Sequence, residues 1–220
     1  MDSRRAESFS DGVFAVAITI LVFNLLPIAD KTASAGAPGT VPLTARNLAH
    51  YWPAYLAYVV SFLTIGIMWI NHHTMLSQVS KVNRTVLVLN LFLLMGIVAI
   101  PFPTALVADH LTGADGGQGQ ATVAAVVYGL VMIVISVGYG ATWIYLAGHQ
   151  EELGARRRVH RPRLSTVRFT IGNAGYVIGT LVAFFSPVTA LIIFGLLAVY
   201  YMFEHLPSDP VDDDQAGPDS

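Results

Sequence analysis

Residues 9–28 read FSDGVFAVAITILVFNLLPI, and this apolar stretch decides the fold class of the chain. A helix rises about 1.5 Å per residue, so about 20 apolar residues cross the roughly 30 Å hydrocarbon core of a bilayer. Only 12% of the 220 residues are charged and 54% are hydrophobic, whereas about 25% of the residues of a soluble domain are charged. The sequence therefore predicts an all-α membrane protein.

Outward from this stretch, five more segments are apolar enough to span a membrane as helices: residues 51–77, 85–108, 121–147, 166–185 and 188–205. Pro27 is expected to close the first helix, and Pro101 and Pro103 are expected to bend or unwind the third. Proline has these effects because it lacks a backbone donor and clashes with the preceding turn. Residues 1–206 are interpreted as one six-span domain, and the acidic residues 207–220 as a disordered tail.

The basic residues are unevenly placed, and this asymmetry predicts the orientation. With the N-terminus in the cytoplasm, ten of the twelve Lys and Arg residues fall on the cytoplasmic side, and only Lys31 and Arg46 fall outside. An even number of spans then returns the C-terminus to the cytoplasm. A signal peptide cleaved near residues 33–35 (ASA) is an alternative, but Asp11 and the length of the apolar stretch favour a retained helix.

Several classes of function lack any support in the sequence. There is no cysteine, and no GxSxG, HExxH or paired intramembrane carboxylates indicate an enzyme. His72 and His73 point about 100° apart on a helix and have no His, Asp or Glu three or four residues away, so no metal or other cofactor is expected. The net charge of −2 indicates no nucleic-acid partner.

Polar residues near the predicted cytoplasmic ends of the helices need partners within the membrane protein. Asp11 is expected to pair with Arg5 or with a histidine of the second helix, because an ionisable group at membrane depth is costly when it is unpaired. Asn90 is expected to hydrogen-bond a neighbouring helix. Simpler interpretations are that Ser10 and Asp11 only cap the first helix, and that Trp69 is an interfacial anchor.

The pattern RxxxFSD at residues 5–11 resembles the motif that opens the first helix of the transmembrane-protein-175 potassium channels of endolysosomes and bacteria. The resemblance continues at residues 17–22 (AITILV), 69–73 (WINHH), 90–91 (NL) and 101–104 (PFPT), and so covers the first three predicted helices. It implies a passive potassium channel in a bacterial plasma membrane. Four copies of the six-helix chain would assemble, with lipid and monovalent cations as the other partners and without a TVGYG filter.

In this family the first helix lines the pore. The resemblance thus assigns Val16 to a hydrophobic constriction, Thr19 to a threonine layer and Phe23 to a further apolar position. With Ile20, these positions follow the i, i+3, i+4, i+7 spacing of one helix face. An apolar ring can gate by dewetting, and a ring of hydroxyls can replace part of the hydration shell of an ion. Because Phe23 is bulkier than the aliphatic residue expected there, either Val16 or Phe23 forms the narrowest ring.

The remaining motif residues are assigned to holding the cytoplasmic end of the first helix: Arg5, Phe9, Ser10, Asp11, Trp69, Asn71, His72, His73 and Asn90. Two alternatives to a channel stay open. One is a secondary transporter that relays protons between Asp11 and the histidine pair, although transporters commonly show repeats and the sequence shows none. The other is a structural or partner-binding membrane protein without transport.

Overall fold

The computed structural model describes residues 2–33, 41–112, 118–154 and 162–204, and this part of the chain is helical with no β-strand. The elements are α1 (Ser3–Ile20), a 3₁₀ turn η1 (Leu21–Leu25), α2 (Leu26–Ala33), α3 (Ala45–His50), α4 (Trp52–Ser77), α5 (Arg84–Ala99), α6 (Pro101–Thr112), α7 (Gln118–Gly148), α8 (Pro162–Val182) and α9 (Pro187–Glu204). The expected tail and most of the predicted arginine loop lie outside the described residues.

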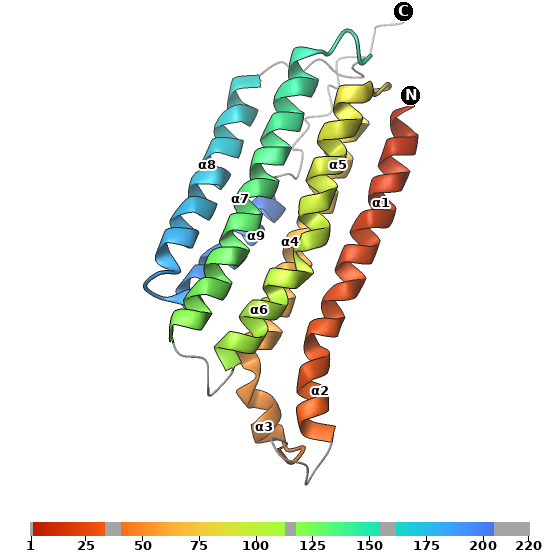
Figure 1. Cartoon of the computed structure of the whole chain (residues 1–220). Coiled ribbons are helices and arrows are strands. Elements are labelled where there is room, and N and C mark those ends of the chain that lie inside the picture. Colours follow the sequence, from red (N-terminus) through yellow and green to blue (C-terminus); the bar gives the residue numbers. More distant parts are fainter. Residues whose placement is uncertain (1, 34–40, 113–117, 155–161, 205–220) are drawn as a thin grey trace, which may run out of the picture.

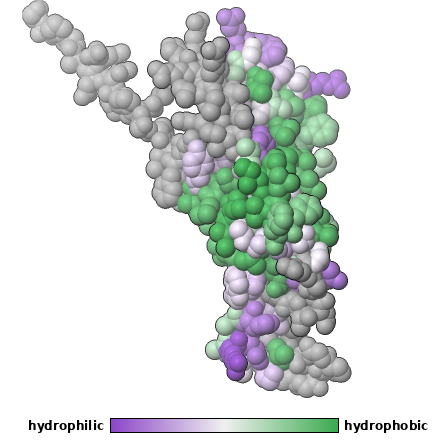
Figure 2. All heavy atoms as spheres, turned by 90° about the vertical axis from the view of Figure 1, so that its left-hand side faces the viewer, coloured by the Kyte–Doolittle hydropathy of each residue, from purple (hydrophilic) through white to green (hydrophobic). Residues whose placement is uncertain are grey.

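Four helical runs are long and apolar enough to cross a membrane: Ser3–Asp30, Trp52–Ser77, Arg84–Leu111 and Gly119–Gly148. The apolar helix at Pro187–Met202 is shorter. Figure 2 shows apolar side chains in the middle of one face of the bundle, with hydrophilic side chains gathered towards its two ends. The expected all-α, multi-pass membrane architecture is therefore confirmed at this level.

The first predicted helix does not end at Pro27, which corrects the expectation from sequence. The backbone tightens into the 3₁₀ turn η1 after Ile20 and then continues as α2 to Ala33. The backbone N–H of Leu26 already bonds the carbonyl of Phe23 in this tighter geometry. Pro27 is therefore the second residue of a new helical segment, where its missing N–H costs little.

The third predicted helix is broken where the prolines predicted a break. α5 ends at Ala99 and α6 begins at Pro101, with the N–H of Ile100 bonded to the carbonyl of Ile97 at 3.1 Å. Pro101 and Pro103 both lie in the first turn of α6, where a missing donor does little harm. The side-chain amide of Asn24 in η1 donates to the carbonyl of Pro101 at 3.0 Å, so the two irregular points of the bundle are joined.

Figure 1 shows α1 at one edge of the bundle and α8 at the opposite edge. α1 packs against α4 and α5. Buried residues of α1, with Leu21 at the start of η1, follow one another three or four positions apart: Ala6, Ser10, Phe14, Ala17 and Leu21. At one end of the bundle, the N–H of Ser3 bonds the carbonyl of Ser80 and the N–H of Lys81 bonds that of Leu153. These bonds attach the start of α1 to the turn between α4 and α5, and they attach that turn to the residues just after α7.

Candidate functional site

One face of α1 and η1 is apolar and uncovered in the single chain. Val16, Ile20 and Phe23 are 54%, 37% and 57% exposed, and Thr19 is exposed between them. In a 3₁₀ turn, side chains three residues apart lie one above the other. The change from α to 3₁₀ geometry after Ile20 therefore keeps Phe23 in line with Ile20. These four residues are called the α1 stripe below.

Thr19 is the polar member of the α1 stripe, and its hydroxyl has a fixed role. Its Oγ1 donates to the carbonyl of Ala15 at 2.6 Å. A hydroxyl carries one hydrogen and two lone pairs, so this bond leaves the oxygen able to act only as an acceptor towards the exposed side. An exposed oxygen acceptor can bind a cation, whereas it cannot donate a hydrogen bond to an anion.

The opposite side of α1 is held by a buried polar network centred on Asn90 of α5. The Asn90 amide donates to Ser10 Oγ at 3.0 Å, and Ser10 donates in turn to the carbonyl of Ala6 at 2.8 Å. Asn90 Oδ1 lies 2.7 Å from His72 Nε2 of α4. Because Oδ1 is an acceptor, His72 must carry its proton on Nε2 in this bond. Three helices are therefore joined through three buried side chains.

A second pair of contacts links α1 to α4 near the same end. Trp69 Nε1 donates to Asp11 Oδ1 at 2.8 Å, and His73 Nδ1 lies 2.6 Å from Glu7 Oε1. Asp11 thus takes a tryptophan as its partner, and not Arg5 or a histidine as expected. The geometry explains why Asp11 meets Trp69. Glu7 and Asp11 are one turn apart on α1, as Trp69 and His73 are on α4, and the two helices run in opposite directions, so Glu7 faces His73 and Asp11 faces Trp69.

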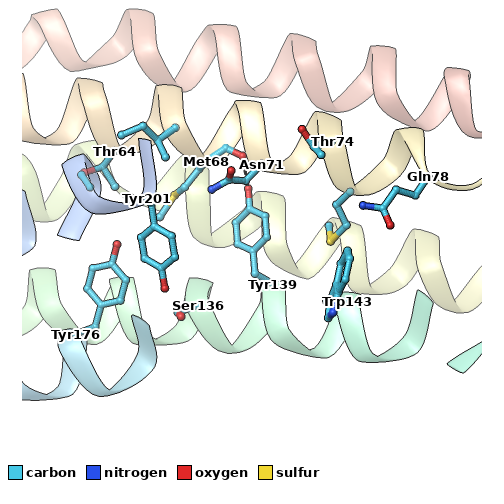
Figure 3. Close-up of a pocket in the computed structure, with 13 residues that line it drawn as sticks. Thr64, Met68, Asn71, Thr74, Gln78, Ser136, Tyr139, Trp143, Tyr176 and Tyr201 are labelled. Atoms are coloured by element: carbon cyan, nitrogen blue, oxygen red, sulfur yellow. Dashed lines mark hydrogen bonds between the residues drawn. The ribbon is translucent and has the colours of Figure 1, made fainter. Parts of the chain in front are cut away.

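The structure brings six of the nine predicted anchor residues together and leaves three elsewhere. Arg5 is exposed. Phe9 is 56% exposed and lies seven residues before Val16, which places it on the side of the α1 stripe. Asn71 lines a cavity between α4 and α7 (Figure 3). The sequence interpretation missed Glu7, although its spacing of four residues from Asp11 was visible.

No group of three His, Cys, Asp or Glu side chains within the described part of the chain could hold a metal ion. The site is instead an apolar face of α1 that carries one exposed hydroxyl oxygen, that of Thr19. Directional hydrogen bonds fix the other face of the same helix. Such an arrangement suits the passage or the exclusion of ions at a helix surface better than it suits bond-breaking chemistry.

Comparisons with known proteins identify similar chains. The family model described as the endosomal/lysosomal potassium channel TMEM175 matches residues 5–101. A potassium channel from Streptomyces collinus is 40% identical over 206 residues, which cover 94% of each chain. The zebrafish endosomal/lysosomal proton channel TMEM175 is 31% identical over 118 residues, which cover 51% of this chain and 22% of that protein.

A solved structure is similar over almost the whole chain. The crystal structure of a lysosomal potassium-selective channel TMEM175 homologue from Chamaesiphon minutus matches with a TM-score of 0.71 at 30% identity. The match covers 92% of this chain and 97% of that chain. The helices after residue 101, which the family model does not match, are therefore similar in arrangement as well.

Proposed function

This chain belongs to the TMEM175 potassium channel family, and from that premise we propose that it forms a passive potassium-permeable channel as a homotetramer. Each chain contributes the α1 stripe to a central pore. The observation that carries this proposal is the exposure of Val16, Ile20 and Phe23 on a helix whose opposite face is buried and hydrogen-bonded. Lipid can cover the apolar members of this face, but the exposed oxygen of Thr19 on the same face favours contact with water and ions in a pore formed by copies of the helix around an axis.

Four copies of the α1 stripe form rings with different chemistry. The rings of Val16, Ile20 and Phe23 present hydrocarbon to the axis, where a narrow apolar ring excludes water and so blocks ions until it widens. The ring of Thr19 presents four hydroxyl oxygens whose hydrogens point to the carbonyl of Ala15 of the same helix. Such a ring offers acceptors that replace part of the hydration shell of a potassium ion.

The topology follows from the placement of the charges on the bundle. Arg4 and Arg5 precede the apolar stretch of α1, and Lys81 and Arg84 flank the turn that the backbone ties to the start of α1. This basic end is proposed to be cytoplasmic. With α8 and α9 as the fifth and sixth spans, both termini lie in the cytoplasm and the chain belongs in the plasma membrane of a bacterium.

The test is ion flux into liposomes that contain the purified tetramer, with potassium, sodium and protons measured separately because one relative is named a proton channel. Wild type is expected to pass potassium down its gradient without a second gradient. Val16→Ala and Phe23→Ala are expected to raise the flux by widening an apolar ring, and the larger increase identifies the narrower ring. Thr19→Ala is expected to lower the preference for potassium over sodium severalfold.

A matched control is Val137→Ala, because Val137 is 56% exposed on α7 and remote from the α1 stripe. It should leave the flux unchanged. If all three stripe variants behave like Val137→Ala, the α1 stripe does not line the pore. If flux requires a second ion gradient, the protein is a coupled transporter, and a folded tetramer with no flux of any tested ion would contradict the channel.

A further inference from the structure

A cavity of about 250 Å³ lies between α4, α7, α8 and α9, on the side of α4 that faces away from α1. Figure 3 shows Asn71 of α4, Tyr139 of α7 and Tyr201 of α9 projecting into the space between these helices. The cavity is called the α4–α7 cavity below. Neither the network that holds α1 nor the α1 stripe is part of its described lining, although the His72 ring packs against that of Tyr139 with centroids 6.5 Å apart.

The lining of the α4–α7 cavity indicates what chemistry it can accept. The described residues that line it include no Asp, Glu, Lys, Arg or His. Its walls combine aromatic rings with aliphatic and thioether side chains, among them Trp143, Ile67 and Met75, and with hydroxyls such as that of Ser136. The described lining offers a charged molecule no counter-charge for its lost hydration, so it suits a neutral occupant.

The side-chain oxygen of Asn71 indicates that the cavity holds a hydrogen-bond donor. Asn71 Oδ1 is buried and has no hydrogen-bond partner among the described residues. The nearby hydroxyl of Tyr139 cannot serve, because it already donates to the carbonyl of Met68 at 2.6 Å. A buried acceptor without a donor is costly, and most such groups in proteins are satisfied by protein, water or ligand. An occupant with one hydrogen-bond donor would satisfy Asn71.

The size of the cavity limits the occupant further. A dry apolar cavity of about 150 Å³ accommodates benzene, so about 250 Å³ accommodates a fused bicyclic ring system. Polar lining residues such as Thr74 and Gln78 can partner water, but the walls near Ile67, Met68 and Ala198 offer hydrocarbon, which a ring system covers better than water does. We propose that the α4–α7 cavity binds a small neutral aromatic molecule that donates one hydrogen bond to Asn71 Oδ1.

This inference goes beyond the channel function and does not depend on it, so a binding measurement tests it directly. The experiment titrates indole and N-methylindole into the purified full-length protein in nanodiscs, with empty nanodiscs subtracted. The two probes share their rings, but N-methylindole lacks the N–H donor. Wild type is expected to bind indole saturably and at least about fivefold more tightly than N-methylindole, the usual effect of one hydrogen bond.

Two variants and a matched control locate the site. Asn71→Leu should weaken indole binding about tenfold and abolish the preference over N-methylindole. Ala198→Phe should abolish binding of both probes, because it fills the cavity from α9. Asn173→Leu is the control, since Asn173 Oδ1 is also buried without a partner in the described part of the chain but is not among the residues found to line the α4–α7 cavity. It should bind indole as wild type does.

Three results would overturn the proposal: no saturable indole binding, equal binding of the two probes by wild type, or an Asn173→Leu variant that loses as much affinity as Asn71→Leu. Equal binding of the two probes would mean that the rings partition without a bond to Asn71. If Asn71→Leu fails to fold, the probe pair on wild type and the Ala198→Phe variant still decide the outcome.

Discussion

The two halves of the first helical run are attached to the bundle by different chemistry. In the half that begins at Ser3, directional hydrogen bonds reach from Ser10 and Asp11 to two other helices. In the half that contains Ala17 and Leu21, attachment is by buried apolar contact, with one hydrogen bond from Asn24 to the Pro101 carbonyl. The first half is therefore fixed in rotation about its axis, and the second half inherits that rotation.

This difference matters because apolar contact is non-directional. A helix held only through Ala17 and Leu21 would have no directional bond to set its rotation, and only the packing of buried side chains would resist turning. The Asn90 network and the Asp11–Trp69 bond prevent this rotation from one to three turns away. The direction in which Val16 and Thr19 point is thus set by residues that do not touch the α1 stripe.

The strongest test of this comparison replaces one amide that holds each half, Asn90 of α5 for the first half and Asn24 of η1 for the second. Asn90→Leu removes two buried hydrogen bonds and leaves His72 Nε2 without its partner. It should therefore lower the unfolding free energy by about 1–3 kcal/mol. Asn24→Leu removes one part-buried bond and should cost about 0.6 kcal/mol, the average for interhelical bonds in membranes. Unfolding of the purified protein in mixed micelles measures both.

Equal losses for Asn90→Leu and Asn24→Leu would show that the two halves are held alike and would remove the distinction. Asn173→Leu is a suitable comparison, because Asn173 Oδ1 is buried without a partner among the described residues, so its replacement removes no bond to that atom there. A larger loss for it than for Asn90→Leu would show that burial of leucine itself, and not the network, governs these values.

A smaller effect is expected for the bond between Asp11 and Trp69. In a double-mutant cycle with Asp11→Ala and Trp69→Phe, the coupling free energy should be about 1 kcal/mol, because the pair is charge-assisted but lies at an exposed position. Asp11→Ala should weaken tetramer assembly more than it changes ion selectivity. Size-exclusion chromatography and the liposome flux assay measure these two properties. An intact tetramer with altered selectivity would contradict the anchoring role.

The sequence predicted the features that depend on local pattern. The i, i+3, i+4, i+7 spacing of residues 16, 19, 20 and 23 places them on one face of an α-helix whatever surrounds it. Proline chemistry predicted the break at Pro101, because a missing donor acts within one turn. The family resemblance, which rested on residues 5–11 and 69–73, is confirmed by the family model and by the relatives.

The features that the sequence did not predict depend on the register between helices. Whether Asp11 meets a histidine or Trp69 is decided by how far α1 slides along α4, and no local pattern contains that distance. The position of Asn71, in contrast, follows from local geometry, because it lies two residues and so about 200° from Trp69 around α4, on the side of the α4–α7 cavity. The effect of Pro27 was misjudged for another reason. The 3₁₀ turn η1 ends just before it, so Pro27 stands in the first turn of a new helical segment, where its missing N–H breaks no helical hydrogen bond.

The smallest effect is expected at the outermost contact, between Glu7 and His73. The His73 side chain is 53% exposed, so when this histidine is protonated, water and salt screen the attraction between its charge and that of Glu7. Glu7→Gln should lower the unfolding free energy by about 0.2–1 kcal/mol, and the loss should shrink as the salt concentration rises from about 0.1 M to 1 M. The loss caused by Asn90→Leu should not change with salt, because its bonds are buried and Asn90 is uncharged. If Glu7→Gln instead cost as much as Asn90→Leu at every salt concentration, the Glu7–His73 contact would act as a hydrogen bond and not as a screened charge pair. The rotation of the α1 stripe would then depend on this contact as much as on the Asn90 network.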